Sequence, residues 1–415
     1  MANFTGTAGD DDFTGTFTYD SFDLTQGGND TAKGRSGNDS FYLGGAFNGG
    51  DRLDAGGGND SATLAGDYSA GLTITAPMLT NFEYLYFTAG NNYDVSLKDG
   101  VHSATYNFTI YGLYLTSGDS LRFDGSEETS NGFSVYGGGG NDRLTGGEGA
   151  DFFYLYYGSG GIDYVSGRGG ADGFSFNETM TRDDRVNGGA GFDNLYLNGD
   201  YSLNMRPTTL VDVENIGLAL GHDYKLTFDD ANIGALEILR VDGYSLADPN
   251  KLIVNGGAET DGAFWVRGGG GKDTFNTGAG NDTQDGRGGA DILNAGDGDD
   301  TLTGGPGHDE LTGGDGQDLF WFYDGDSPFA NPDLIMDLAL SDGIYLSNID
   351  ADTTVANDQT FTLVSSFSNT AGELTLEYDA GLNRTFFLMD TDGDGAADQR
   401  FAAVGNRTAF TNFEL

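Results

Sequence analysis

The sequence contains no cysteine, only 6 prolines and only 3 histidines among its 415 residues. The absence of cysteine excludes disulfide bonds and thiol chemistry. Although 71 residues are glycine, the scarcity of proline excludes a collagen-like chain, which needs both residues in a three-residue period. The sequence also lacks an apolar run of the ~18 residues needed to cross a bilayer. We therefore expect no membrane span.

Basic residues are scarce as well: 19 lysines and arginines oppose 65 aspartates and glutamates, which gives a formal net charge of −46. Without a basic patch to neutralise phosphates, nucleic acid is excluded as a partner. Such a charge opposes a compact state by self-repulsion unless cations neutralise it. Because 13% of the residues are aromatic, permanent disorder is a poor alternative. We expect a chain that is loose without cations and folded with them.

Motifs of common hydrolases are absent. None of His102, His222 and His308 lies in the H-E-x-x-H motif of zinc proteases, and no G-x-S-x-G nucleophile motif occurs. Counting does not exclude a glycosidase-like carboxylate pair, since acidic residues are abundant. We expect a protein that is not an enzyme, with a polysaccharide-active enzyme as the less favoured alternative.

What the sequence does contain is a nine-residue repeat that runs without a gap through six units from Gly268 to Trp321. The units read GGGGKDTFN, TGAGNDTQD, GRGGADILN, AGDGDDTLT, GGPGHDELT and GGDGQDLFW. The sixth position of every unit is aspartate: Asp273, Asp282, Asp291, Asp300, Asp309 and Asp318. A flexible glycine-rich linker would not keep aspartate in register through six units.

Each position of the repeat suits a coil built around a cation. Glycines at positions one, two and four can adopt positive φ without steric cost and direct carbonyl oxygens inward. The sixth-position carboxylate joins them, and oxygen ligands of this kind suit Ca²⁺. Apolar residues such as Leu293, Leu302 and Leu311 are expected to point into the stack. The glycines expected to take part include Gly268, Gly270, Gly286, Gly288, Gly304 and Gly313.

Two units would complete one coil, so each aspartate should meet the aspartate two units further along: Asp273 with Asp291, Asp282 with Asp300, Asp291 with Asp309, and Asp300 with Asp318. A Ca²⁺ shared between successive coils would take about six to eight oxygens, and the block would bind several ions. This pattern is the parallel β-roll repeat of RTX proteins, and the block resembles that family.

Two further blocks carry the aspartate spacing in degenerate form, and we expect their aspartates to bind Ca²⁺ too. One contains Asp142, Asp151, Asp163, Asp172, Asp184 and Asp193, and the N-terminal one contains Asp11, Asp30, Asp39, Asp51 and Asp60. Adding 133 converts Asp30 into Asp163 and Asp60 into Asp193, and an offset of 131 converts Glu83 into Glu214. The blocks are therefore related by duplication. The N-terminal block is less regular, since the step from Asp20 to Asp30 exceeds the repeat length by one.

The resulting organisation has six parts. They are a degenerate β-roll at 1–64, a strand-rich insert at 65–136, a β-roll at 137–197, a second copy of the insert at 198–267, the regular β-roll at 268–322, and a C-terminal cap at 323–415. Aromatic and β-branched runs with glycine and asparagine punctuation indicate short strands in the inserts. We expect the inserts to be wider coils of the solenoid rather than separate small β-domains. Their aromatic residues, Trp265 included, are expected mainly in the core.

The C-terminal part, from about Tyr323 onward, resembles the C-terminal region of type I-secreted RTX proteins such as the serralysins. The resemblance rests on Pro332-Asp333-Leu334-Ile335 after the repeats, the D-x-D-G-x-x-D segment within Asp390 to Asp398, and the terminal Phe413-Glu414-Leu415. It implies export through a type I ABC exporter, directed by an uncleaved C-terminal signal, to the extracellular space or the bacterial cell surface. The N-terminal residues have neither the basic nor the apolar region of a secretory signal peptide.

The segment with Asp390, Asp392, Asp394 and Asp398 also resembles an EF-hand loop, but Phe401 stands where the bidentate glutamate should be. A β-turn capped by aspartate side chains is the favoured interpretation, with weak metal binding as the alternative.

Together these features predict an all-β protein: a parallel β-roll or β-solenoid with calcium-binding nonapeptide coils, two duplicated inserts and a C-terminal β cap. The favoured function is a secreted, Ca²⁺-folded structural component of a surface layer or extracellular matrix that self-associates into a lattice or filament. The resemblance to RTX proteins of bacterial surface layers supports this hypothesis. The alternative is a Ca²⁺-dependent adhesin that binds a cell-surface glycan through its inserts.

Overall fold

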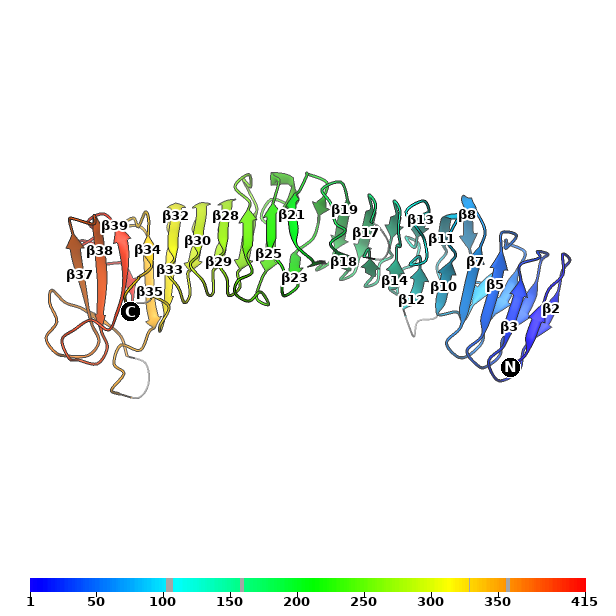
Figure 1. Ribbon diagram of the computed structural model, residues 1–415, viewed down its shortest axis with the longest axis horizontal. Helices are drawn as coiled ribbons and strands as arrows, with labels where there is room; N and C mark the ends of the chain where they lie inside the picture. The colour runs from blue at the N-terminus through cyan, green and yellow to red at the C-terminus, as the bar shows by residue number, and fades with distance from the viewer. Residues whose placement is uncertain (102–106, 157–159, 328, 356–358) are drawn as a thin grey trace. The chain divides into compact units, whose positions relative to one another are not determined.

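The computed structural model describes residues 1–101, 107–156, 160–327, 329–355 and 359–415. These residues form short β-strands almost throughout, and the helical structure among them is one 3₁₀ turn, η1 (Asp230–Asn232). No helix in these ranges is long or apolar enough to span a membrane. Successive strands stack in parallel as the coils of a β-solenoid (Figure 1), which confirms the fold class expected from the sequence.

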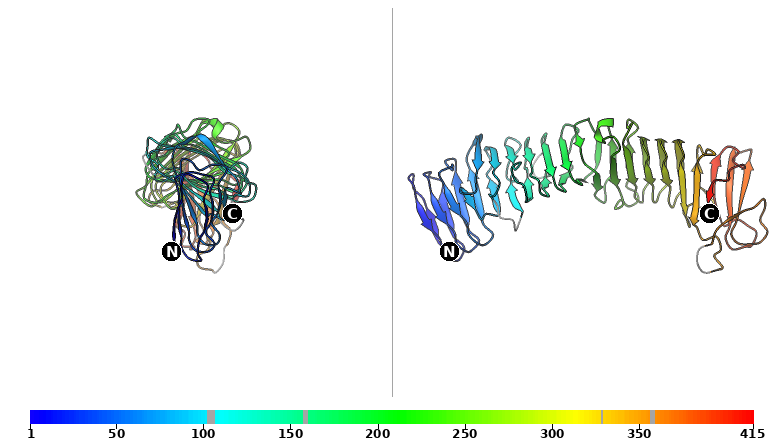
Figure 2. Two further views of the ribbon diagram at one scale, coloured as in Figure 1. Left: turned by 90° about the vertical axis from the view of Figure 1, so that its right-hand side faces the viewer. Right: turned by 180° about the vertical axis from the view of Figure 1, so that it is seen from behind.

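The chain divides into two compact units. Unit 1 comprises Met1–Asn198 and Thr208–Glu214, and unit 2 comprises Gly199–Pro207 and Asn215–Leu415. Within each unit the strands of neighbouring coils lie side by side, as Figure 2 shows from behind. Each coil contributes one strand to each of two faces.

In unit 1 one face is a single parallel sheet. It contains β1 (Asn3–Thr5), β3 (Ser21–Leu24), β5 (Ser40–Gly44), β7 (Ser61–Ala65), β10 (Tyr84–Phe87), β12 (Phe108–Tyr111), β14 (Phe133–Tyr136), β16 (Phe152–Tyr154), β18 (Gly173–Asn177) and β20 (Asn194–Asn198). The other face has two parallel sheets. The first contains β2 (Asp12–Thr14), β4 (Thr31–Lys33), β6 (Arg52–Asp54) and β9 (Leu79–Thr80). The second contains β8 (Tyr68–Ile74), β11 (Asn92–Leu97), β13 (Ser120–Asp124), β15 (Arg143–Thr145), β17 (Tyr164–Gly169), β19 (Arg185–Ala190) and β22 (Leu210–Val211).

Unit 2 has the same two-faced arrangement. One parallel sheet contains β23 (Asn215–Leu218), β25 (Ile238–Asp242), β27 (Ala263–Arg267), β29 (Thr283–Asp285), β31 (Thr301–Thr303), β33 (Leu319–Tyr323), β35 (Gly343–Asn348) and β40 (Phe413–Glu414). The other contains β21 (Tyr201–Asn204), β24 (Tyr224–Thr227), β26 (Leu252–Asn255), β28 (Thr274–Ala279), β30 (Ile292–Asp297), β32 (Glu310–Asp315), β34 (Leu334–Ile335) and β39 (Gln399–Val404).

The register follows the sequence period. In the regular block Thr274 lies opposite Ile292, so neighbouring coils are offset by two nonapeptide units. In the degenerate block the offset is slightly longer, with Tyr164 opposite Arg185. Coils of the inserts are wider still, as the pairing of Tyr224 with Leu252 shows. The inserts are thus continuous with the repeats and share their sheets.

Alternation along each strand places the core between the two faces. Leu293, Leu302 and Leu311 are fully buried, and their neighbours along the strand point outward, as the period of two requires. Aromatic residues stack from coil to coil inside unit 1, where the rings of Phe22 and Phe41 lie 4.5 Å apart. This inward column supplies the hydrophobic burial that holds the coils together.

The C-terminal residues close unit 2 with antiparallel strands. β39 pairs with β38 (Arg384–Asp390), which pairs with β37 (Glu373–Asp379), and β36 (Thr362–Leu363) lies beyond β37. Phe401 of β39 stacks on Phe322, with ring centroids 4.1 Å apart. The C-terminal residues therefore pack on the last coil as a β cap.

Candidate calcium-binding ladders

The sixth-position aspartates of the regular block form two hydrogen-bonded rows, here called the aspartate ladders. In the first, the backbone N–H of Asp273 donates to Oδ1 of Asp291 at 2.8 Å, and Asp291 donates likewise to Asp309 at 2.7 Å. The second ladder links Asp282 to Asp300 at 2.7 Å and Asp300 to Asp318 at 3.1 Å. The structure thus brings together the pairs that the two-unit period predicts. All six aspartates are buried.

Both ladders continue beyond the repeat. The N–H of Asp309 donates to Oδ1 of Asp333 at 2.9 Å, and that of Asp318 donates to Oδ1 of Asp342 at 3.3 Å. The sequence did not reveal these two residues as ladder members, because the step to each exceeds the two-unit period. The available signal was local: Asp333 directly precedes the apolar strand β34, just as each repeat aspartate precedes a strand.

Unit 1 contains ladders of the same kind. In the middle block they run Asp142–Asp163–Asp184 and Asp151–Asp172–Asp193. In the N-terminal block they run Asp11–Asp30–Asp51 and Asp20–Asp39–Asp60. Asp20 is therefore a ladder member despite its irregular spacing.

Glutamates take the next place in two of these rows. The N–H of Asp60 donates to Oε2 of Glu83 at 2.7 Å, and the N–H of Asp193 donates to Oε2 of Glu214 at 2.6 Å. The duplication pairs Glu83 with Glu214, but the sequence pattern alone did not assign either residue to a site.

The second carboxylate oxygen of many ladder aspartates is buried without a hydrogen-bond partner. Among the described residues this holds for Oδ2 of Asp39, Asp60, Asp142, Asp172, Asp193, Asp282, Asp291, Asp300, Asp309, Asp318 and Asp333. Burying a charge is costly unless it is paired or coordinates a metal. Repetition of the same orphaned oxygen in every block indicates a recurring partner.

The first-position glycines show where that partner fits. A Cβ atom on Gly268 would lie 2.3 Å from Oδ2 of Asp273 and 2.5 Å from the carbonyl oxygen of Gly286 in the next coil. A Cβ on Gly286 would lie 2.5 Å from Oδ2 of Asp291 and 2.7 Å from the carbonyl oxygen of Gly304. A carboxylate and a carbonyl of adjacent coils therefore converge at each of these positions. Carboxylate and carbonyl oxygens are the ligands that Ca²⁺ takes.

The glycine roles expected from the sequence need correction. Positive φ occurs at positions two and four, as in Gly278 (104°) and Gly280 (106°), but not at the first position. At Gly268 and Gly286 the absence of a side chain instead leaves free the space between the converging oxygens, whereas Thr277 and Ala295 take the first position in the second and fourth units. A Cβ on Gly304 or Gly313 would likewise lie close to Oδ2 of Asp309 or Asp318, whereas Gly270 and Gly288 have no ladder carboxylate among their nearest atoms.

Electrostatics leads to the same conclusion. Burial raises the pKa of Asp291 to about 8, and the charge of Asp309 adds to the effect. Burial likewise raises the pKa of Asp142 to about 8 and that of Asp282 to about 7. A divalent cation at the orphaned oxygens would hold these carboxylates ionised at neutral pH. The residues present therefore fit Ca²⁺.

A further carboxylate lies at the start of the second regular-block ladder. Phe264 stands where the coil before Asp282 would carry its aspartate, and its N–H donates to Oδ1 of Asp282 at 2.7 Å. Burial raises the pKa of Asp282, and hydrogen bonds partly offset this effect. The nearby charge of Glu259 raises the pKa of Asp282 further. Oε1 of Glu259 accepts the N–H of Gly262 at 2.7 Å, while Oε2 is buried without a partner.

Glu259 belongs to a group of three carboxylates that could hold a metal ion. One oxygen each of Asp230, Glu259 and Asp261 lies within 4.8 Å of the others. In the first insert copy the equivalent of Asp261 is Ser130, whose hydroxyl donates to Oε1 of Glu128, the equivalent of Glu259, at 3.0 Å. The sequence did not reveal this group because its members come from irregular loops.

The C-terminal aspartate segment lies in the hairpin between β38 and β39. Asp390, Asp392 and Asp398 form a compact group, but backbone donors occupy its buried carboxylate: Gly393 donates to Oδ1 of Asp390 at 2.7 Å and Gly395 to Oδ2 at 2.9 Å. Asp394 accepts the N–H of Ala396 at 2.8 Å. These bonds are those of a turn capped by aspartate side chains.

The two histidines in the described part of the chain, His222 and His308, have separate local partners. Nδ1 of His308 lies 2.5 Å from the carbonyl oxygen of Pro332, and Nδ1 of His222 lies 3.5 Å from a carboxylate oxygen of Asp200. His102 lies outside the described residues.

Two family models match the chain. The model described as Peptidase M10 serralysin C terminal matches residues 103–414, and that described as RTX calcium-binding nonapeptide repeat (4 copies) matches residues 25–62. No curated protein matches. Among solved structures the chain is similar to the AlgE6R3 subunit of the Azotobacter vinelandii mannuronan C5-epimerase, at 20% identity and a TM-score of 0.25, over 41% of this chain and 82% of that chain. This likeness is too weak to bear on function.

Proposed function

Because the chain belongs to the serralysin C-terminal family of RTX calcium-binding proteins, we propose that it is secreted, folds on Ca²⁺ outside the cell, and serves as a structural component of a surface layer or extracellular matrix. The observation that carries the proposal is the row of buried, unpartnered carboxylate oxygens along the aspartate ladders. These oxygens make the fold itself dependent on cations. No catalytic role is proposed for them, because each ladder aspartate has a place in the coil.

The ladders would act as a folding switch. Where Ca²⁺ is scarce, repulsion within a chain of charge −46 favours the unfolded state, which suits passage through a type I ABC exporter. Outside the cell, a site with a Kd of ~10⁻⁴ M contributes about 1.4 kcal/mol at about millimolar Ca²⁺. Five such sites would supply about 7 kcal/mol, which is comparable to the whole stability of a typical domain. Many weak sites together can therefore decide whether the chain folds.

Self-association is the second part of the proposal. Among the described strands, β1 pairs only with β3, and β2 only with β4. The other edge of each strand has no partner among the described residues, and such an edge is a template for a strand of another molecule. Phe4 and Phe13 lie on this coil with ring centroids 5.5 Å apart, and both side chains are half-buried. A coil from a second copy would cover them.

Titration of the full chain with Ca²⁺, followed by light scattering and negative-stain microscopy, tests the structural role. We expect ordered sheets or filaments at millimolar Ca²⁺ and their loss on chelation. A folded protein that stays monomeric at every Ca²⁺ and protein concentration would contradict the structural role while leaving Ca²⁺-dependent folding intact.

A further inference from the structure

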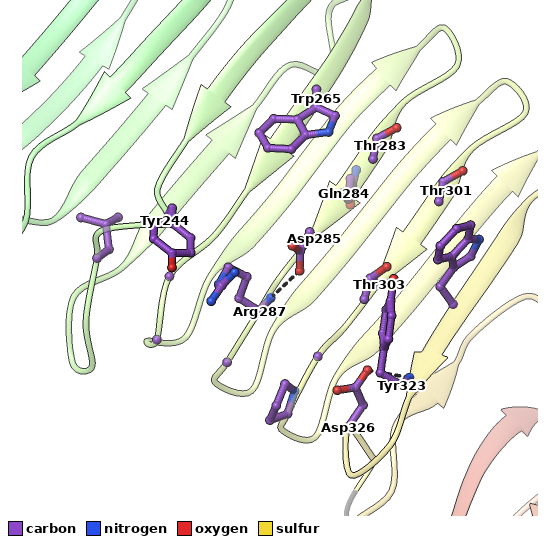
Figure 3. Close-up of a pocket in the computed structure, with 17 residues that line it drawn as sticks. Tyr244, Trp265, Thr283, Gln284, Asp285, Arg287, Thr301, Thr303, Tyr323 and Asp326 are labelled. Atoms are coloured by element: carbon purple, nitrogen blue, oxygen red, sulfur yellow. Dashed lines mark hydrogen bonds between the residues drawn. The ribbon is translucent and has the colours of Figure 1, made fainter. Parts of the chain in front are cut away.

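A trough of about 720 Å³ opens on the outer face of unit 2, across β27, β29, β31 and β33. Its walls include Trp265 and Tyr244 at one end and Trp321 and Tyr323 at the other. Figure 3 shows the side chains of Tyr244, Trp265 and Tyr323 around it. Both tryptophans of the sequence, Trp265 and Trp321, thus line the trough. Contrary to expectation, Trp265 is not a core residue: it takes an outward, half-buried position on β27.

The floor of the trough is made of small polar side chains. Register places Thr283 and Thr301 in line with Trp265, and Asp285 and Thr303 in line with Trp321. The floor is therefore two coils wide between aromatic walls on β27 and β33. Three strand spacings separate those walls, or about 14 Å. The ring of Trp321 is backed by Tyr345, stacked at 4.4 Å, which fixes its orientation.

Comparison of the two duplicated segments, each an insert with the β-roll that follows it, shows that the opening is not a necessity of the fold. In unit 1 the same outward column is filled by stacked tyrosines, with ring centroids 4.8 Å apart for Tyr111 and Tyr136 and 4.4 Å apart for Tyr136 and Tyr154. The offset of 131 converts Tyr154 into Asp285 and Phe152 into Thr283. Large rings in copy 1 are thus replaced by small polar residues in copy 2, which leaves the trough between its walls.

Charges around the trough nearly cancel: Asp242, Asp285 and Asp326 stand against Arg267 and Arg287, which leaves one carboxylate in excess. Arg267 makes a bidentate pair with Asp242 at 2.7 and 3.0 Å and lies over the rings of Tyr244 and Trp265. Asp285 faces Arg287 and accepts its backbone N–H at 3.1 Å, as the dashed line in Figure 3 marks. The chain as a whole has a net charge of −46, so a polycation would have no reason to bind at this patch rather than elsewhere on the acidic surface. A polyanion would be repelled by the rest of the molecule.

We propose that the trough binds a neutral polysaccharide, with pyranose rings against the tryptophan and tyrosine faces and sugar hydroxyls on the threonine and aspartate groups of the floor and on Arg287 beside them. Aromatic surface with a few placed polar groups is the usual composition of a ligand pocket, and the volume lies in the usual range of roughly 300–1,000 Å³. Tyrosine and tryptophan offer an apolar face together with a polar edge, which matches the alternating C–H and hydroxyl surfaces of a sugar. The inference rests on the proposed function, because it gives the extracellular protein a ligand to hold.

The test uses the Ca²⁺-loaded full chain with neutral hexasaccharides of β-1,4-glucose, β-1,3-glucose and β-1,4-mannose, and with a polyuronate hexasaccharide. Both tryptophans line the trough, so binding is read from intrinsic tryptophan fluorescence and checked by calorimetry. We expect at least one neutral saccharide to shift the emission saturably and the polyuronate to bind at least tenfold more weakly.

Two variants place the binding in the trough. Trp265→Ala removes one wall, and Asp285→Tyr restores the copy-1 residue and fills the floor; each should weaken binding at least tenfold. Tyr136→Ala in unit 1 is the matched control and should bind like the unmodified chain. The proposal is overturned if no neutral saccharide binds, if the polyuronate binds best, or if Asp285→Tyr binds normally. Ca²⁺-induced β-structure and assembly are measured on the same samples, so loss of sugar binding with intact assembly refutes the trough alone.

Discussion

The backbone N–H of Asp291 donates to Oδ1 of Asp309 at 2.7 Å, while Oδ2 of Asp309 is buried without a partner. One carboxylate thus has two functions: Oδ1 holds adjacent coils in register, and Oδ2 is available to bind a cation. Because the same relationship recurs in each of the three blocks, Ca²⁺ binding and coil stacking are coupled through single side chains.

Asp309→Asn separates these two functions. The amide oxygen can still accept the N–H of Asp291, but the negative ligand is gone. We expect the Ca²⁺-saturated protein to lose about 1–3 kcal/mol of unfolding free energy, while the Ca²⁺-free chain is not destabilised, since a buried charge is removed. Urea unfolding at saturating Ca²⁺ measures the first quantity, and circular dichroism in chelator at pH 5, where the Ca²⁺-free chain is expected to keep β-structure, follows the second. Asp297→Asn, at an exposed position, is the control and should change neither by more than about 0.5 kcal/mol.

Gly286→Ala tests the space at the first repeat position. The added Cβ would lie 2.5 Å from Oδ2 of Asp291 and 2.7 Å from the carbonyl oxygen of Gly304, so it should displace the cation ligands. We expect the Ca²⁺ midpoint of folding to rise at least severalfold. Gly288→Ala is the matched control, because its Cβ would meet nothing closer than 3.9 Å. Equal midpoints for the two variants would refute the assigned position.

Stability of the Ca²⁺-free chain should fall as pH rises. Burial raises the pKa of Asp142, Asp151, Asp291 and Asp333 to about 8, from 3.8. The folded state therefore binds more protons than the unfolded state between these two pKa values, and its stabilisation is fully present below about pH 3.8 and is lost as pH rises to about 8. Circular dichroism in chelator should show more β-structure at pH 5 than at pH 8.5. With Ca²⁺ present, acid should instead weaken binding, because protons compete for the same oxygens. An apo chain that gains β-structure with increasing pH would contradict the buried ladders.

Glu259→Gln tests the three-carboxylate group in unit 2. We expect the number of bound Ca²⁺ ions, counted by native mass spectrometry, to fall by one. Glu128→Gln is the internal control, since Ser130 replaces the third carboxylate beside it, and the count should stay unchanged. If both variants or neither lose an ion, Glu259 has no metal-binding role distinct from that of Glu128.

The sequence was sufficient wherever the period was regular. Leu293 and Asp291 were placed correctly because a nonapeptide repeat determines both the inward residue and its partner two units later. Asp333 was not recognised as a ladder member because the coil that carries it is longer than two repeat units, and the local pattern of an aspartate before an apolar strand is common elsewhere. Glu259 escaped notice because a loop between coils, rather than a repeat position, presents its carboxylate.

Two errors have physical causes. Glycine at the first position was attributed to backbone conformation, whereas the structure shows that a side chain at Gly268 or Gly286 would enter the space between the converging oxygens. Trp265 was expected in the core because large aromatic residues usually fill buried faces. Strand alternation places Trp265 on the outer face, where it lines the trough. The trough is open because Asp285 stands where the first copy has Tyr154. That replacement became meaningful only when the structure showed which residues share the outward column.

The most direct test of the central claim is a Ca²⁺ titration of the full chain at neutral pH, followed by far-ultraviolet circular dichroism with bound ions counted in parallel. The ladders predict little β-structure in chelator and a cooperative gain of β-structure as several ions bind at up to millimolar Ca²⁺. A chain that is fully β-structured in chelator and does not change on adding Ca²⁺ would contradict the account.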